Sequence, residues 1–324
     1  MKRFTRRRSE ALHRAGGEGD AVRTDCHQHL WPPSLLAALR ARRTPPRLDG
    51  WTLHLPGEPP CALDPAAHDV AARAAAEAAD GTGRALVSLS SPLGLEHLPG
   101  EEAQPLLDAW HEGAVELPEP FRVWAAAGVT DLDPGALAKT LRHERVVGLQ
   151  LPATALADPR AVERLAPLLA ECELADKPVL VHPGPAPAGD HAALPPWWPA
   201  LVPYVQQLHA AWLAWHVAGR ARHPRLRTAF VALAGLAPLH HERLAARGGA
   251  LGPLDPLVHY ESSSYGPRAI DALVRVVGVD PLVLGTDRPY AQPFEAADLP
   301  GFGAAFAHAL TTTNPAHLLD GSPR

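Results

Sequence analysis

Three histidines and one aspartate stand where short apolar segments of the chain end. His27 and His29 end one such segment, His182 ends a second and Asp287 ends a third. Residues two apart in an extended strand point to the same side, so His27 and His29 direct two imidazoles into one space. Three nitrogens and one carboxylate oxygen suit Zn²⁺, and Mn²⁺ or Fe²⁺ also fit. The four residues predict a site for one divalent metal ion if the fold brings their segments together.

The body of the chain alternates apolar or β-branched runs with helical patterns. Runs of this kind are typical of buried parallel strands. Strands are predicted at 21–26, 84–90, 121–127, 145–151, 177–182, 226–232, 257–262 and 281–286. Helices are predicted at 66–80, 104–113, 133–142, 158–174, 201–221, 238–248, 267–277 and 302–311. Eight alternations predict an α/β fold, a closed (β/α)8 TIM barrel.

Such a barrel would gather the four side chains, because its active site is built at the C-terminal ends of the strands. The histidines end strands one and five, and Asp287 ends strand eight, which lies beside strand one when the barrel closes. Two long loops, 31–65 and 183–200, follow strands one and five, and loops in this place commonly form substrate walls. A doubly wound open sheet is the rival fold. No glycine-rich phosphate loop follows any strand, which argues against a nucleotide-binding version.

Composition narrows the domain organisation and the function classes. Residues 1–20 are expected to be a disordered basic tail, and 21–324 to be one barrel domain. No run approaches ~18 unbroken apolar residues, which argues against a membrane span. The net charge of −5 gives no overall attraction for nucleic acid. The 3 cysteines fit a reducing cytoplasm. We therefore expect a cytoplasmic protein with a small-molecule substrate and no nucleic-acid or membrane partner.

Several motifs resemble the amidohydrolase superfamily, in its amidohydrolase-related branch (amidohydrolase family 2), which includes the aminocarboxymuconate-semialdehyde decarboxylase type. They are Asp25-Cys-His-Gln-His-Leu-Trp31, Val179-Leu-Val-His-Pro183, Leu284-Gly-Thr-Asp-Arg-Pro-Tyr290 and Thr313-Asn-Pro-Ala-His-Leu-Leu319. The resemblance covers about residues 21–320. It implies that His27, His29, His182 and Asp287 hold one metal, and that Asp287 is also catalytic. Related barrels often form dimers, so the resemblance leaves a homodimer open.

One segment departs from the family pattern. The family places a histidine at the end of strand six, in a segment like His-x-Gly-Gly before a proline. This chain reads Phe230-Val-Ala-Leu-Ala-Gly-Leu-Ala-Pro238, so Ala232 or Leu233 takes that position. Neither side chain binds a metal or moves a proton. Strand four ends Gly148-Leu-Gln-Leu-Pro152, with no lysine or glutamate to bridge two ions, so we expect a mononuclear site.

Three functions fit these residues. The first is a metal-dependent hydrolase, in which a metal-activated water attacks an amide, lactone or ester-type small molecule and Asp287 accepts the proton. The alternative is a metal-dependent decarboxylase of an unsaturated or aromatic acid, which the missing strand-six histidine puts in question. The second alternative is a catalytically inactive barrel that binds a small molecule.

Residues next to the predicted ligands are candidates for substrate contact. Trp31, Arg288 and Tyr290 are predicted to bind the substrate. Arg288 would either clamp a substrate carboxylate or form a salt bridge at the barrel rim. Asp25 either orients the metal ligands by hydrogen bonds or simply bonds to backbone at the strand edge.

Overall fold

The protein contains an eight-stranded parallel sheet. The computed structural model describes residues 22–186, 194–195, 197–250, 252, 254–291 and 302–321, and the predicted tail at 1–20 lies outside them. The strands pair in chain order and are β1 (Thr24–Gln28), β5 (Arg84–Val87), β6 (Phe121–Ala125), β7 (Val146–Pro152), β8 (Val179–His182), β9 (Thr228–Phe230), β10 (Val258–Glu261) and β11 (Leu282–Val283). Each matches one predicted strand within a few residues. Their side chains are almost entirely buried, as the continuously apolar runs predicted.

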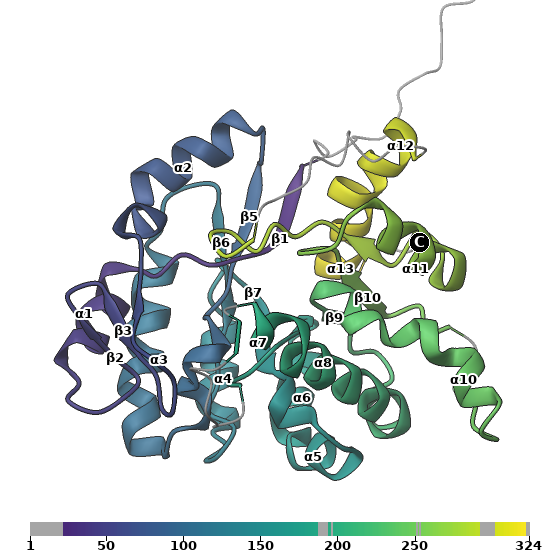
Figure 1. Cartoon of the computed structure of the whole chain (residues 1–324), viewed down its shortest axis with the longest axis horizontal. Coiled ribbons are helices and arrows are strands. Elements are labelled where there is room, and N and C mark those ends of the chain that lie inside the picture. Colours follow the sequence, from purple (N-terminus) through teal and green to yellow (C-terminus); the bar gives the residue numbers. More distant parts are fainter. Residues whose placement is uncertain are drawn as a thin grey trace, which may run out of the picture.

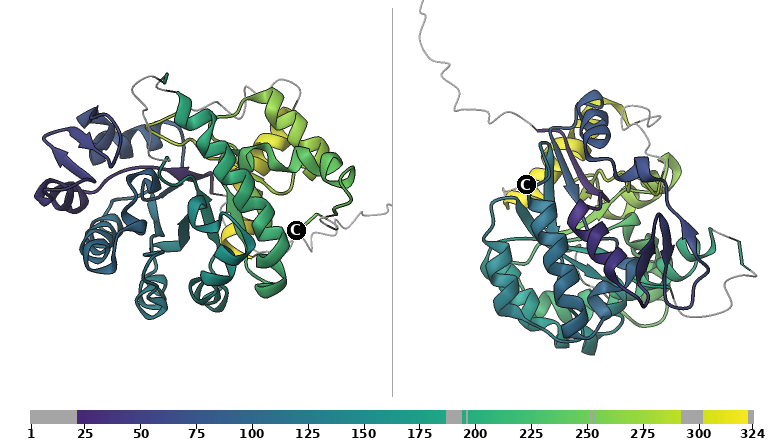
Figure 2. Two further views of the ribbon diagram at one scale, coloured as in Figure 1. Left: turned by 60° about the horizontal axis from the view of Figure 1, so that its bottom comes forward. Right: turned by 90° about the vertical axis from the view of Figure 1, so that its left-hand side faces the viewer.

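Backbone hydrogen bonds between β1 and the segment after β11 close the sheet. Cys26 N donates to Leu284 O at 2.8 Å, and Thr286 N donates to His27 O at 3.1 Å. The predicted (β/α)8 TIM barrel is therefore confirmed, with helices around the sheet (Figures 1 and 2). Closure brings the first and last strands together, although 258 residues separate Cys26 from Leu284 (284 minus 26).

Helices cover the outside of the barrel. They are α1 (Pro33–Ala41), α2 (Val70–Ala79), α3 (Gly100–Val115), α4 (Pro134–Leu141), α5 (Pro159–Arg164), α6 (Ala166–Leu174), α7 (Trp198–Leu201), α8 (Pro203–Ala214), α9 (Arg220–Arg222), α10 (His241–Ala245), α11 (Pro267–Val277), α12 (Gly303–His308) and α13 (Asn314–Asp320). Short helical turns connect several of them: η1 (Pro65–His68), η2 (Ser91–Leu93), η3 (Leu95–His97), η4 (Ala153–Leu156), η6 (Trp215–Gly219), η7 (Ala232–His240) and η9 (Ala309–Thr313). The Asp133 and Asp158 carboxylates accept hydrogen bonds from the first turns of α4 and α5, as N-caps do. No helix in the described ranges is long and apolar enough to cross a bilayer.

The loop after strand one contains a small antiparallel sheet that was not predicted. Its strands are β2 (Arg47–Asp49), β3 (Thr52–His54) and β4 (Cys61–Ala62), and they lie with α1 at one side of the barrel (Figure 1). The His68 ring joins this sheet to the barrel, because it stacks on Trp31 at 4.7 Å and on Trp51 at 6.2 Å between ring centroids. Burial lowers the pKa of His68 to about 4, so the stacked ring is neutral. The second long loop, 183–200, falls partly outside the described residues.

Glu96 is a buried carboxyl group away from the four candidate ligands. It lies on η3 after β5, and Ser91 Oγ donates to its Oε1. Its Oε2 has no hydrogen-bond partner within the described part of the chain. Burial raises its pKa from 4.5 to about 7, and the hydrogen bond from Ser91 opposes that rise. The folded state therefore favours the protonated acid.

Glu96→Gln is expected to make the unfolding of the protein less sensitive to alkaline pH. A folded-state pKa above the unfolded value stabilises the fold at low pH, and this contribution is lost as the pH rises through about 7. Glutamine does not titrate. The unfolding free energy of the variant minus that of wild type should therefore be larger at about pH 8 than at about pH 5, by on the order of 2–3 kcal/mol. Urea unfolding of both proteins at the two pH values measures this. The same difference in unfolding free energy at both would contradict it.

Candidate metal centre

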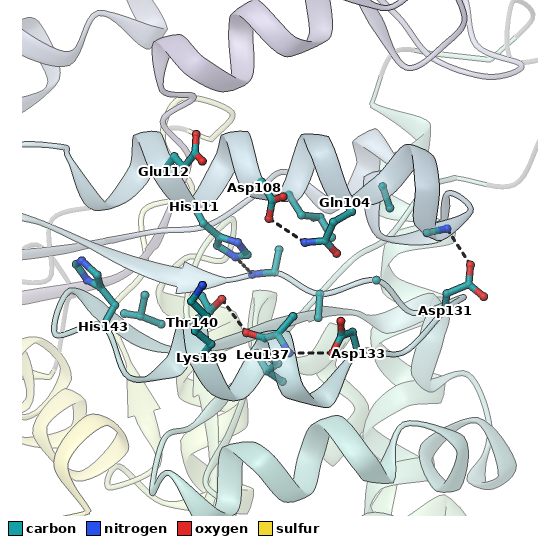
Figure 3. A pocket seen from close by; sticks show the side chains of 18 of the residues that line it. Gln104, Asp108, His111, Glu112, Asp131, Asp133, Leu137, Lys139, Thr140 and His143 are labelled. Carbon is teal, nitrogen blue, oxygen red and sulfur yellow. Dashed lines mark hydrogen bonds between the residues drawn. The ribbon is translucent and has the colours of Figure 1, made fainter.

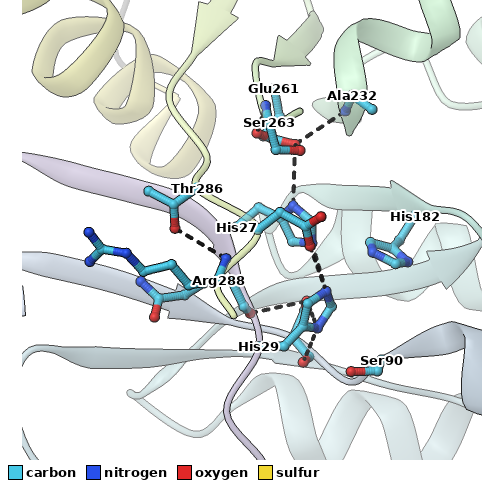
Figure 4. Close-up of polar contacts among 12 residues, drawn as sticks. His27, His29, Ser90, His182, Ala232, Glu261, Ser263, Thr286 and Arg288 are labelled. Carbon is cyan, nitrogen blue, oxygen red and sulfur yellow. Dashed lines mark hydrogen bonds and ion pairs between the residues drawn. The ribbon is translucent and has the colours of Figure 1, made fainter. Parts of the chain in front are cut away.

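The four predicted ligands converge at one end of the barrel. The ligand atoms of His27, His29, His182 and Asp287 all lie within 4.8 Å of one another. His29 Nε2 lies 3.2 Å from His27 Nε2 and 3.2 Å from Asp287 Oδ1. No other group of three or more His, Cys, Asp or Glu side chains in the described ranges offers ligand atoms in this way. The structure thus brings together every residue of the predicted set (Figure 4).

Local backbone structure aims these side chains at one point. His27 and His29 come from the end of β1, and His182 is the last residue of β8. Asp287 has a left-handed backbone with φ of 55°, and its N–H donates to His27 O at 2.9 Å. A non-glycine residue in this region is strained, and such strain is common at functional sites.

Each histidine donates its Nδ1 proton away from the centre. His27 Nδ1 donates to Glu261 Oε2 at 3.3 Å. His29 Nδ1 donates to the Ser88 carbonyl at 3.0 Å, and His182 Nδ1 donates to the Pro183 carbonyl at 2.8 Å. Each partner offers an acceptor oxygen, so a ring that gives its Nδ1 proton to that partner keeps a lone pair on Nε2.

The facing Nε2 atoms and the Asp287 carboxylate form a compact set of donor atoms for a cation. Imidazole Nε2 atoms with Nδ1 bound to oxygen acceptors are the usual arrangement of histidine ligands to a metal. Three such nitrogens with one carboxylate are a donor set that suits a single zinc, manganese or iron ion. The residues present therefore fit a mononuclear metal site.

The protonation states also suit metal binding. Burial lowers the pKa of His27 to about 3 and the pKa of His182 well below its usual value. Burial raises the pKa of Asp287, but the hydrogen bond from His29 and the charges of the histidines outweigh it and hold that pKa below its usual value. Neutral imidazoles and an ionised carboxylate are the forms that bind a metal.

Asp25 ties together the backbone segments that carry the ligands. Its carboxylate accepts from Thr286 Oγ1 at 2.6 Å, Thr286 N at 3.1 Å and His27 N at 3.2 Å. The interpretation of Asp25 as a bond to backbone at the strand edge is confirmed. Burial raises its pKa to about 7, and the bonds from Thr286 and His27 oppose this.

Arg288 forms a salt bridge at the barrel rim, which was one of its two predicted roles. Its Nη1 lies 3.0 Å from Glu77 Oε1, and its Nη2 donates to Asp80 Oδ2, so both guanidinium nitrogens are held by α2 and the residue after it.

Trp31 is buried, and its Nε1 donates to Ser90 Oγ at 2.9 Å. Tyr290 is exposed, and its ring centroid lies 5.3 Å from that of His29. Substrate contact by Arg288, Trp31 and Tyr290 stays a prediction.

Glu261 is the residue of the site that was missed from the sequence. It is the last residue of β10, and none of it is exposed. Its Oε2 accepts from Ser263 Oγ at 2.7 Å and from Ala232 N at 3.2 Å, in addition to His27. Burial raises its pKa to about 8, and a cation held by the histidines would oppose that rise. The sequence offered only one indication of this role, a glutamate near the end of the predicted strand 257–262.

A separate groove lies elsewhere on the molecule. It has a volume of about 470 Å³ and runs between α3 and α4, with His111 and His143 among its lining residues (Figure 3). His111 Nε2 accepts a hydrogen bond from Ala126 N at 3.0 Å. The groove contains none of the four candidate ligands, so it is not the metal site.

Solved structures with a similar fold include several decarboxylases. IDCase from Metarhizium anisopliae is 18% identical with a TM-score of 0.75, over 93% of this chain and 97% of that one. The 5-carboxyvanillate decarboxylase of Sphingomonas paucimobilis is 19% identical with a TM-score of 0.71, over 93% and 99%. The enzyme of the same name from Novosphingobium aromaticivorans, solved with manganese and a nitrobenzoic acid, is 18% identical with a TM-score of 0.66, over 94% and 97%. No family model and no curated protein matches the chain. The likeness establishes the fold, in agreement with the resemblance of the motifs.

Arg288→Ala is expected to destabilise the protein, because Glu77 is fully buried and would lose its ion-pair partner. Breaking a buried pair in this way costs about 3–5 kcal/mol. Urea unfolding measures the loss. The double variant Glu77→Gln with Arg288→Ala should recover part of it, because the buried carboxylate charge is removed together with its partner. An Arg288→Ala variant of unchanged stability would contradict the structural role.

Proposed function

We propose that this protein is a metal-dependent enzyme with one divalent ion, and that it decarboxylates an aromatic or unsaturated carboxylic acid. The observation that carries the metal site is the convergence of three Nε2 lone pairs on the Asp287 carboxylate, each histidine held from behind by an oxygen acceptor. The decarboxylase activity is supported by the fold likeness to enzymes whose names specify decarboxylation of aromatic acids. A fold hosts many activities, so the site residues must carry the rest of the argument.

The metal, held by His27, His29, His182 and Asp287, would supply Lewis-acid stabilisation of negative charge on the substrate. Asp287 is placed to move a proton, because its Oδ1 lies among the ligand nitrogens and its carboxylate is partly accessible. In decarboxylation the bond to the carboxyl carbon breaks, its electron pair stays on the substrate carbon, and a proton must reach that carbon. We assign the delivery of this proton to Asp287, which is ionised and must first take the proton from water or from an acidic group of the substrate. The Tyr290 ring, next to His29, would contact an aromatic substrate.

The metal is either manganese or zinc. Nitrogen and carboxylate ligands accept both, and zinc is the ion that the sequence alone favours. Three structures of similar fold were solved with manganese. Both ions are therefore used in the tests below.

Hydrolysis of an amide, lactone or ester is the second candidate, and Ala232 is the observation that favours it. The strand-six histidine that assists decarboxylase-type relatives has no counterpart here, because its place is taken by Ala232 or Leu233, whose side chains move no proton. Release of carbon dioxide separates decarboxylation from hydrolysis, and no turnover of either substrate class would leave a small-molecule-binding barrel. A cytoplasmic location, a homodimer and the absence of nucleic-acid and membrane partners stay predictions.

His182→Ala is expected to remove the metal and the activity together, because a buried ligand is lost. Removing a residue that hydrogen-bonds to a metal ligand lowers metal affinity or activity about 10–100-fold. Removing a ligand itself should lower them at least as much. Elemental mass spectrometry should find about one manganese or zinc per wild-type chain and almost none in the variant. Full turnover by metal-free His182→Ala would exclude this site.

Asp287→Asn is expected to lower activity more than metal content. The amide keeps an oxygen donor for the metal but no longer carries a proton for delivery. The measurement is carbon dioxide release from a set of hydroxybenzoic acids, with metal content determined on the same samples. Equal losses of metal and activity would assign Asp287 to metal binding alone.

A further inference from the structure

One of the three imidazoles is held by a side chain and not by the backbone. His29 and His182 donate to the carbonyls of Ser88 and Pro183, whereas His27 donates to the Glu261 carboxylate. A backbone carbonyl is set by the fold and cannot be exchanged, but a carboxylate can be replaced and must itself be held. The orientation of His27 therefore depends on one side chain of β10.

Hydrogen-bond donors surround the Glu261 carboxylate. Ser263 N donates to Oε1, while Ser263 Oγ, Ala232 N and His27 Nδ1 all approach Oε2 (Figure 4). Each backbone N–H is a fixed donor, so the group that fits this place is an acceptor on both oxygens. Glutamate meets that condition. Glutamine does not, because its amide nitrogen would face a donor.

The surrounding backbone is shaped to fit this carboxylate. Residues 232–236, at the start of η7, have φ values of 46° to 62°, a run of left-handed residues that costs about 1–2 kcal/mol for each non-glycine residue. The first of them, Ala232, presents its N–H to Glu261. On the other side lies Gly285, where an added Cβ would overlap Oε1 of Glu261. The strained backbone at 232–236 thus presents an N–H to the Glu261 carboxylate, and the lack of a side chain at Gly285 leaves room for it.

We infer that Glu261 is a positioning residue of the metal site, which keeps the His27 Nδ1 proton on the side of the carboxylate and the Nε2 lone pair on the side of the metal. It acts from β10, and its carboxylate accepts from the N–H of Ala232, which with Leu233 stands where the resembled family places its strand-six histidine. The inference rests on the proposed metal site. It adds to that site a residue that touches neither metal nor substrate.

The test is the zinc affinity of Glu261→Gln, measured by competition with a chelator. When the amide nitrogen takes the place of Oε2, it donates towards His27 Nδ1, so the ring is driven to carry its proton on Nε2, which blocks the metal. The affinity should fall about 10–100-fold, the usual effect of an outer partner of a ligand. Glu96→Gln is the matched control, because Glu96 is equally buried and bonded to a serine but contacts none of the ligands. Its zinc affinity should equal that of wild type.

A spectroscopic readout separates positioning from general loss of structure. In the zinc-loaded protein, the Nδ1–H resonance of His27 should report a hydrogen bond to a carboxylate, and those of His29 and His182 a bond to a carbonyl. Glu261→Gln should move the His27 resonance and leave the other two in place. A variant that is merely destabilised would alter all three.

Gly285→Ala perturbs the Glu261 carboxylate without removing it. Its Cβ should displace Glu261 and weaken zinc binding in the wild-type background. In the Glu261→Ala background the space is empty, so the same substitution should have little further effect. This non-additive pair keeps the inference testable if Glu261→Gln fails to fold.

The outcomes distinguish the two proposals. Wild-type protein that binds no zinc or manganese would overturn the proposed function. Wild-type protein that binds zinc, with Glu261→Gln binding it equally well and the His27 resonance unmoved, would overturn the role of Glu261 alone.

Discussion

Three imidazole rings at one end of the barrel turn their Nε2 atoms towards one another, and unprotonated nitrogens placed in this way repel. The rings cannot rotate away, because each Nδ1–H is bonded to an oxygen behind it: the Ser88 carbonyl, the Pro183 carbonyl or the Glu261 carboxylate. The arrangement is favourable only when positive charge lies between the rings. A divalent cation would supply that charge, which is why the proposed function places a metal at this end of the barrel.

The closure of the barrel holds the histidine rings and Asp287 in this arrangement. The segments that carry His27 and Asp287 are far apart in the chain, and backbone bonds between β1 and the segment after β11 place them side by side. Asp25 adds bonds to both segments from within. Arg288, held by Glu77 and Asp80, fixes the same segment to α2 from outside. The geometry of the four side chains is therefore a property of the whole barrel.

The fold and the four ligands could be predicted because their signals are local. Buried apolar runs mark the strands, and His27, His29, His182 and Asp287 stand at the ends of such runs. The sheet β2–β4 could not be predicted, because strands of two or three residues carry no periodic pattern. The partners of the ligands were also missed. Glu261 is 234 residues from His27 along the chain, and nothing local connects them. For Arg288 the sequence left two roles open, and only the positions of Glu77 and Asp80 on the neighbouring helix settled the salt bridge.

The central claim is that one metal ion sits among these four residues, and anomalous X-ray scattering tests it most directly. Crystals of the protein grown with zinc should give one strong anomalous peak, at about 2.0–2.1 Å from the Nε2 atoms and about 2.0–2.2 Å from an oxygen of Asp287. We expect that peak with the Nδ1 atoms still bonded to their oxygen acceptors. No peak at this place at saturating zinc, or a peak bound through Nδ1, would contradict it.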